Sequence, residues 1–246
     1  MTDPDAAIAG RLAALRARIE RAAKRAGRSP EAVSLVGVSK RKSAAEVAAA
    51  VRAGVAHIGE NYVQEAISKV LEVNGKIDPD RLPCWHFVGQ LQRNKAGRVA
   101  ELFDVVETVD RASLGEALSR RALAAARTLR VLLQVNVSGE AQKGGLAPDA
   151  LPALLEASRS WQGLRVTGLM AIPAAATDPE ASRPAFARLR KLRDALRDAP
   201  GGGDLDQLSM GMSGDFEVAI EEGATIIRVG TALFGPRSGF DGRTAQ

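Results

Sequence analysis

Eight short, apolar segments recur along this chain of 246 residues, and stretches with helical spacing separate them. The segments span residues 33–38, 56–59, 85–88, 104–109, 130–137, 165–169, 206–210 and 225–229. Short, nearly continuous apolar runs are typical of strands that are buried on both faces of a parallel sheet. Strands that alternate with helices favour parallel βαβ units. At this length, eight such units predict an α/β fold of the (β/α)8 TIM-barrel class.

The helices of these units are expected at residues 44–53, 62–73, 95–102, 112–127, 148–159, 179–197 and 216–222. An extra helix, rich in Ala, Leu and Arg, is expected before the barrel at residues 6–26, with Gly27 as its C-terminal cap. A doubly wound open sheet is the alternative, but no Gly-x-Gly-x-x-Gly motif follows the first strand. No domain boundary is evident, so we expect a single domain over residues 1–246, with a flexible tail at 238–246.

Composition argues against several other classes of protein. No apolar stretch is long enough to cross a bilayer, and the acidic N-terminus lacks the apolar core of a signal peptide, so we expect a cytoplasmic protein without membrane contact. The formal net charge is +5, but acids are interspersed among the basic residues. This pattern favours solvated helix faces over a nucleic-acid-binding stripe, and it is equally compatible with a small phosphate-bearing ligand.

The residues that commonly bind metals are few in this chain. The single Cys84 excludes an intramolecular disulfide and a cysteine-based metal cage. The only histidines, His57 and His86, lie in strand-like segments without a carboxylate and histidine set suited to a metal. We therefore expect no metal site.

Polar residues follow the carboxyl ends of the predicted strands, which is the face where barrels bind ligands. Lys40 comes directly after the first strand, and Asn61 follows the second. A lysine at the mouth of a buried strand is expected to be partly desolvated, which favours the neutral amine. A neutral amine attacks carbonyls and can hold an aldehyde cofactor as a Schiff base. The alternative is that Lys40 only marks the point where the strand meets water.

Two later segments suit a phosphate group. Ser213 lies between the seventh strand and the next helix, where it can be the N-cap of a turn whose free N–H groups face an anion. Gly230 and Thr231 close the eighth strand, and the loops after strands seven and eight are the usual phosphate site of such barrels. Arg228 would then point into the barrel mouth. The alternatives are a plain N-cap at Ser213 and a barrel-filling salt bridge at Arg228.

Seven motifs, in this order and spacing, resemble the family of pyridoxal phosphate homeostasis proteins over nearly the whole chain. They are LVGVSKRK (35–42), HIGENYVQE (57–65), WHFVGQLQRNK (85–95), QVNVSGEAQKGG (134–145), GLMAIP (168–173), LSMGMSGD (208–215) and RVGTALFG (228–235). Members of this family are barrels similar to the N-terminal domain of alanine racemase. The resemblance therefore implies the same fold and the cofactor pyridoxal 5′-phosphate.

The resemblance also assigns roles to individual residues. It implies that Lys40 carries the cofactor as a Schiff base and that Arg228 lies beside the pyridine nitrogen, with Asn61 near the ring. It implies that the phosphate is held by Ser213, Gly230 and Thr231. This chain departs from the family at Arg41 and Ser43, where Thr and Pro are common, and at Arg93, where a small Ser is common. We expect these departures to alter the rim and charge of the site.

Chemical reasoning favours a carrier of the cofactor over an enzyme. An arginine cannot accept a proton from the ring nitrogen, so the ring is a poorer electron sink than with a carboxylate partner. A two-base racemase also needs a second acid or base, which alanine racemase takes from a domain that this chain lacks. Tyr62, His86 and Cys84 are candidates for that second group.

We therefore expect a monomeric protein that buffers pyridoxal phosphate and delivers it to apo-enzymes dependent on the cofactor. The alternatives are a weak amino-acid racemase or lyase, a barrel enzyme that acts on a sugar phosphate through Lys40, and a nucleic-acid-binding module.

Overall fold

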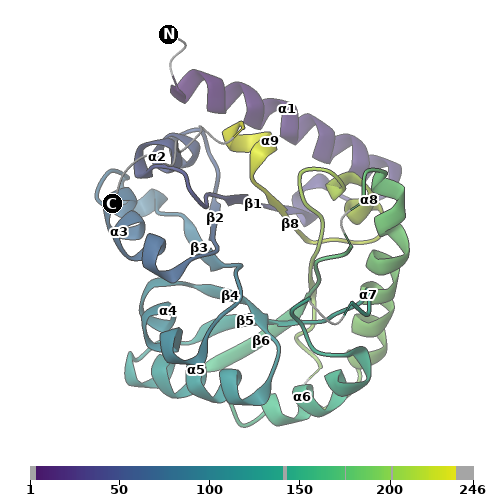
Figure 1. Ribbon diagram of the computed structural model, residues 1–246. Coiled ribbons are helices and arrows are strands. Elements are labelled where there is room, and N and C mark those ends of the chain that lie inside the picture. The colour runs from purple at the N-terminus through teal and green to yellow at the C-terminus, as the bar shows by residue number, and fades with distance from the viewer. Residues whose placement is uncertain (1–3, 141–142, 175, 201, 237–246) are drawn as a thin grey trace, which may run out of the picture.

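The computed structural model describes residues 4–140, 143–174, 176–200 and 202–236, and its strands form one closed parallel barrel. Each strand pairs with the next along the chain, and β1 pairs with β8 to close the ring (Figure 1). The strands are β1 (Ser34–Val38), β2 (His57–Glu60), β3 (Cys84–Phe87), β4 (Val105–Val109), β5 (Leu129–Gln134), β6 (Leu164–Met170), β7 (Gln207–Ser209) and β8 (Ile226–Val229). The predicted TIM barrel is confirmed, and the β1–β8 pairing excludes the open sheet.

Helices surround the barrel on its outer side (Figure 1). They are α1 (Pro4–Arg25), α2 (Ala44–Arg52), α3 (Val63–Asn74), α4 (Ala96–Leu102), α5 (Ala112–Ala124), α6 (Leu151–Ser158), α7 (Arg183–Leu196), α8 (Phe216–Glu221) and α9 (Thr231–Phe234). Short 3-10 turns lie at Pro30–Ala32, Pro79–Arg81, Arg93–Lys95, Pro148–Ala150 and Pro179–Ser182. None of the helices in the described ranges is long and apolar enough to span a bilayer.

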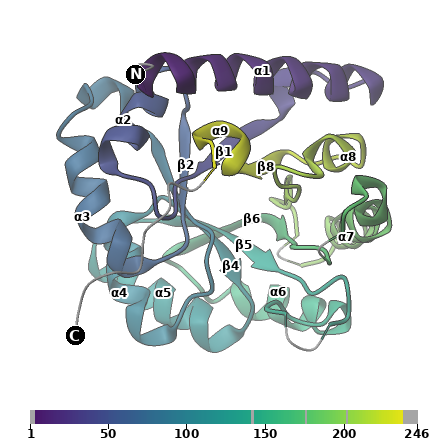
Figure 2. The ribbon, with the colours of Figure 1, turned by 45° about the horizontal axis from the view of Figure 1, so that its top comes forward.

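The N-terminal helix α1 covers the seam where β8 meets β1. It lies across α9 and between α2 and α8 (Figure 2). Its inward face repeats at helical spacing through Ile8, Leu12, Leu15 and Ile19, each at most 6% exposed. Because α9 has only four residues, α1 supplies the apolar cover that a longer last helix would otherwise provide.

The sequence places most element boundaries within a few residues. Gly27 follows α1 at φ +64°, and the Gly27 and Arg28 N–H groups bond the carbonyls of Lys24 and Ala23, as expected for a glycine-capped helix end. The fifth strand is shorter than predicted because the chain after Gln134 pairs with its own loop near residue 146. Helix α9 was not predicted. The expected tail at 238–246 lies outside the described residues.

Candidate functional site

The carboxyl ends of the strands surround a cavity of about 440 Å³. The residues that line it come from the ends of both early and late strands, so segments far apart in the sequence meet there. They are Val38, Lys40, Lys42, Asn61, Val88, Ile172, Met212, Ser213, Gly214, Arg228, Gly230, Thr231, Phe234 and Gly235. All six residues predicted to bind a ligand are among them. The cavity lies on the face where barrels bind ligands.

Lys40 lies in a tight turn directly after β1. The turn is closed by the Lys42 N–H, which donates to the Ser39 carbonyl at 3.0 Å. Ser39 is fully buried, whereas Lys40 is exposed at the cavity mouth. The expected partial desolvation of Lys40 is therefore wrong in this structure, because the chain leaves the barrel interior between Ser39 and Lys40.

A buried ionic network beside this turn fixes its position. The Lys69 ammonium donates to Glu60 at 2.7 Å, to Glu65 at 2.6 Å and to the Ser39 carbonyl at 2.8 Å. The Ser39 hydroxyl donates to Glu60. Burial raises the pKa of Glu60, and the nearby Lys69 charge only partly opposes this. The network therefore fixes Ser39 and, through it, the position of Lys40.

The same network holds the other side of the turn. The Arg41 N–H donates to Glu65 at 2.6 Å, and Arg41 has a left-handed backbone with φ of 60°. Neither Lys69 nor Glu65 was singled out from the sequence, although their spacing of four residues within α3 is a signal for an ion pair.

Arg228 forms the floor of the cavity and is only 4% exposed. Its guanidinium donates to the Ser209 hydroxyl at 2.5 Å and to the Ala171 carbonyl at 3.0 Å. Burial lowers the pKa of Arg228, and the charge of Glu107, 3.8 Å away, opposes this. Arginine has five N–H donors, so donors remain for a ligand in the cavity.

Glu107, which sequence reasoning missed, links Arg228 to the barrel interior. Its carboxylate accepts from the Ser209 hydroxyl at 2.6 Å and contacts His86 Nδ1 at 2.6 Å. Burial alone would raise the pKa of Glu107, but His86 and Arg228 outweigh it, so the pKa lies below its usual value. The signal in the sequence is a lone carboxylate within the apolar run of β4.

Asn61 carries a buried polar atom without a partner. Its side-chain oxygen is inaccessible to solvent and has no hydrogen bond to any described residue. Gly89 packs directly on the Asn61 backbone, since a Cβ at Gly89 would lie 2.0 Å from the Asn61 carbonyl oxygen. An unpartnered polar atom on a cavity wall is costly unless a ligand satisfies it.

Ser213, Gly230 and Thr231 line the same cavity, and Ser213 lies beside the start of α9. The Thr231 hydroxyl and the Ala232 N–H both lie 3.5 Å from the Ser213 hydroxyl oxygen. Ser213 is not a helix N-cap as expected: α8 begins at Phe216, and its N-cap is Asp215. The reason is a turn over 212–215, in which the Asp215 carboxylate accepts the Met212 N–H at 2.7 Å.

The candidates for a second acid or base lie elsewhere. Tyr62 is 49% exposed beside α3, and His86 is buried among His57, Cys84 and Glu107. None of Tyr62, His86 and Cys84 is among the described residues that line the cavity.

Comparison with known proteins places the chain among close relatives. A family model described as alanine racemase, N-terminal domain, matches residues 11–238. A pyridoxal phosphate homeostasis protein of Pseudomonas aeruginosa is 50% identical over 231 residues, which make up 94% of this chain and 96% of that protein. The protein of the same name from Vibrio cholerae is 43% identical over 221 residues, or 90% of this chain and 92% of the relative.

A solved structure is similar as well. PipY of Synechococcus elongatus PCC7942, whose structure contains bound PLP, is 38% identical to this chain. The match covers 93% of this chain and 100% of PipY, with a TM-score of 0.81.

Proposed function

Because this chain belongs to the family of pyridoxal phosphate homeostasis proteins, we propose that it binds pyridoxal 5′-phosphate in the cavity and buffers or delivers it. The amine of Lys40 would hold the aldehyde as a Schiff base, and Arg228 would lie beside the ring nitrogen, with Asn61 near the ring. The residues proposed to hold the phosphate are Ser213, Gly230 and Thr231. When bound, the cofactor supplies an electron sink. An arginine partner weakens this sink, because a charged guanidinium cannot accept a hydrogen bond from a protonated ring nitrogen, so that nitrogen stays unprotonated.

The convergence of six residues from four separate segments on one cavity is the observation that carries this proposal. The residues also fit the group. The unpartnered Asn61 oxygen and the remaining Arg228 donors offer polar contacts, and about 440 Å³ is within the range of small-molecule sites. The structure of PipY, a relative of similar fold, contains bound PLP.

The absorption spectrum of the purified protein tests the proposal. After addition of pyridoxal phosphate and removal of the unbound cofactor, we expect a visible band that disappears on borohydride reduction in the wild type and is absent from Lys40→Ala. Lys76→Ala, which removes an exposed lysine outside the cavity, is the matched control and should keep the band. A wild-type protein that is colourless after the same treatment would overturn the proposal and favour a sugar-phosphate substrate.

The side chains that line the cavity favour a carrier of the cofactor over an enzyme. Among the described residues, its charged groups are Lys40, Lys42 and Arg228, and Lys42 already contacts Glu46 at 3.2 Å and the Phe234 carbonyl at 3.3 Å. This lining offers no carboxylate, imidazole or phenol as a second base for racemization. Racemization of a free amino acid by the wild type that Lys40→Ala abolishes would contradict the carrier function and support the racemase alternative.

We further propose that the chain is a monomer and that apo-enzymes dependent on pyridoxal phosphate are its recipients. Direct delivery predicts that the rate of cofactor transfer rises with the concentration of the apo-enzyme, whereas release into solution predicts a constant rate. Light scattering tests the oligomeric state. The cytoplasmic location stays a prediction of the sequence.

A further inference from the structure

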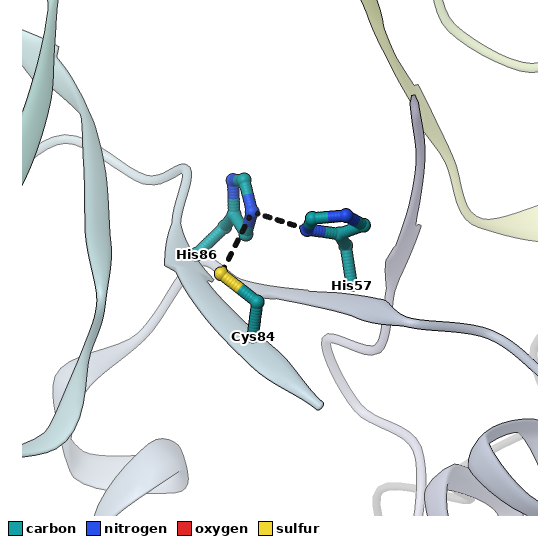
Figure 3. Close-up of side chains that lie close together, drawn as sticks. All are labelled: His57, Cys84 and His86. Carbon is teal, nitrogen blue, oxygen red and sulfur yellow. Dashed lines mark hydrogen bonds between the residues drawn. The ribbon is translucent and has the colours of Figure 1, made fainter. Parts of the chain in front are cut away.

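Two histidines and the cysteine meet at the amino-terminal end of the barrel, away from the cofactor cavity. His57 opens β2 and Cys84 opens β3, and these two residues are register partners in the sheet. His86 lies two residues after Cys84, so both side chains project from the same face of β3. Figure 3 shows all three side chains turned toward one another.

The distances between these side chains suit a tetrahedral metal ion. His57 Nδ1 lies 3.0 Å from His86 Nε2, and Cys84 Sγ lies 3.5 Å from the same nitrogen. One ligand atom from each residue lies within 4.8 Å of the others. In a tetrahedral zinc site, two nitrogens are about 3.4 Å apart and a nitrogen and a sulfur about 3.6 Å apart. Small movements of the side chains would therefore complete the geometry.

The surroundings of His86 are those of a metal ligand. His86 Nδ1 lies 2.6 Å from a Glu107 oxygen, and the other Glu107 oxygen accepts from Ser209. A carboxylate that holds one ring nitrogen of a histidine orients the other nitrogen toward a metal. Here that other nitrogen is the one that faces His57 and Cys84.

The thiol is also prepared to act as a ligand. Arg130 donates to Cys84 Sγ at 3.0 Å. A neighbouring guanidinium favours the thiolate form of a cysteine. The thiolate, rather than the thiol, binds metals.

A second cavity offers a route for the ion. His57 lines this cavity, of about 610 Å³, between α1 and the amino ends of the strands. Its other walls include Leu12, Arg16 and Glu31. His57 and Cys84 are partly exposed, whereas His86 is only 2% exposed.

We propose that His57, Cys84 and His86 bind one divalent transition-metal ion, for which Zn²⁺ is the best match, with a water in the fourth position. Two imidazoles and one thiolate are the ligand types that zinc prefers, and three protein ligands leave one position open. The expectation of no metal site rested on the lack of a carboxylate and histidine set suited to a metal near His57 and His86. The register of β2 and β3 instead brings the thiol of Cys84 beside the two histidines.

Calorimetric titration of the tag-free, reduced protein with Zn²⁺ tests the site. We expect one ion per chain, and affinity at least about tenfold weaker in Cys84→Ser and in His57→Ala. Glu72→Gln, an exposed substitution on α3, should bind as the wild type does. X-ray absorption spectra of the zinc-loaded wild type should show a sulfur neighbour at the distance of a zinc–thiolate bond. Because the chain has one cysteine, this neighbour should be absent in Cys84→Ser.

A second measurement needs no substitution. Zn²⁺ should slow alkylation of Cys84 by iodoacetamide in the wild type, and a chelator should restore the rate. Absence of 1:1 binding at micromolar Zn²⁺, or binding that neither protects Cys84 nor depends on it, would overturn the proposal.

Discussion

Arg228 joins two groups of polar residues that the barrel would otherwise separate. On one side it lines the cofactor cavity, and on the other it contacts Ser209 and lies near Glu107 inside the barrel. The bonds to Ser209 and the Ala171 carbonyl hold the guanidinium in one orientation. Lysine offers a single point of donation, so Arg228→Lys is not a conservative change at this position.

Asn61 allows a separation of ligand binding from stability. Because its side-chain oxygen is buried without a partner in the described structure, Asn61→Ala should not lower the free energy of unfolding and should raise it by up to about 1 kcal/mol. The same substitution should weaken pyridoxal phosphate binding by about tenfold, the worth of roughly one hydrogen bond. Chemical denaturation and an absorbance titration measure the two effects. A loss of stability with unchanged binding would mean that Asn61 has only a structural role.

At the scale of elements, Lys69 connects α3 to the ends of β1 and β2. It is 5% exposed, and Glu60 is fully buried. Lys69→Met would leave the Glu60 carboxylate without its cation, which should cost about 3–5 kcal/mol in the free energy of unfolding. Urea denaturation at pH 8 measures this cost. The exposed Lys76→Met is the control and should have little effect.

The loss in Lys69→Met should also depend on pH. Without Lys69, the folded-state pKa of Glu60 rises further above its unfolded value, because burial already raises it. Such a carboxyl destabilises the fold above its unfolded pKa, and the penalty disappears as pH falls through the folded pKa. The difference between wild type and variant should therefore shrink from pH 8 to pH 5. A difference that grows at low pH would contradict this account of Glu60.

Ser43 shows how a departure from the family's pattern is accommodated. It is the N-cap of α2: its hydroxyl accepts the Glu46 N–H at 3.2 Å, and Glu46 in turn accepts the Ser43 N–H at 2.9 Å. Ser43→Ala should therefore lower stability by about 1 kcal/mol. Thermal denaturation measures it, with the exposed Ser160→Ala as a control. Equal melting temperatures for both variants would mean that the cap contributes nothing.

The elements could be predicted because each depends on a local pattern. Apolar runs marked the strands, and the six cavity residues followed from their positions at strand ends and from the family resemblance. The N-cap expected at Ser213 was wrong because a carboxylate two residues later, on Asp215, competes for the turn. Arg41 and Arg93 also departed from the family, but neither is among the described residues that line the cavity.

At the scale of the whole molecule, the features that escaped prediction depend on register between strands. Cys84 lies 27 residues after His57 in the sequence and beside it in the sheet, and Glu107 reaches His86 from the next strand. Periodicity identifies a strand but does not fix which residues face each other across a barrel. The interior network from Arg228 to Cys84 therefore could not be predicted from the sequence.

The helix α1 links the stability of the molecule to the cofactor site. Arg11 of α1 donates to the Leu233 carbonyl of α9 at 2.7 Å, and α9 begins at Thr231, on the cavity wall. The apolar face of α1 thus supports, from outside the barrel, the segment proposed to hold the phosphate.

Leu12 tests this support, because it is 2% exposed on that face. Leu12→Ala should lower the free energy of unfolding by about 2–5 kcal/mol, the usual range for such a cavity in a core. Leu71→Ala, at a leucine that is 65% exposed, should have an effect near zero. Urea denaturation of both variants measures the difference. If α1 were only loosely attached, the two variants would unfold at the same urea concentration, and the seam between β8 and β1 would need another cover.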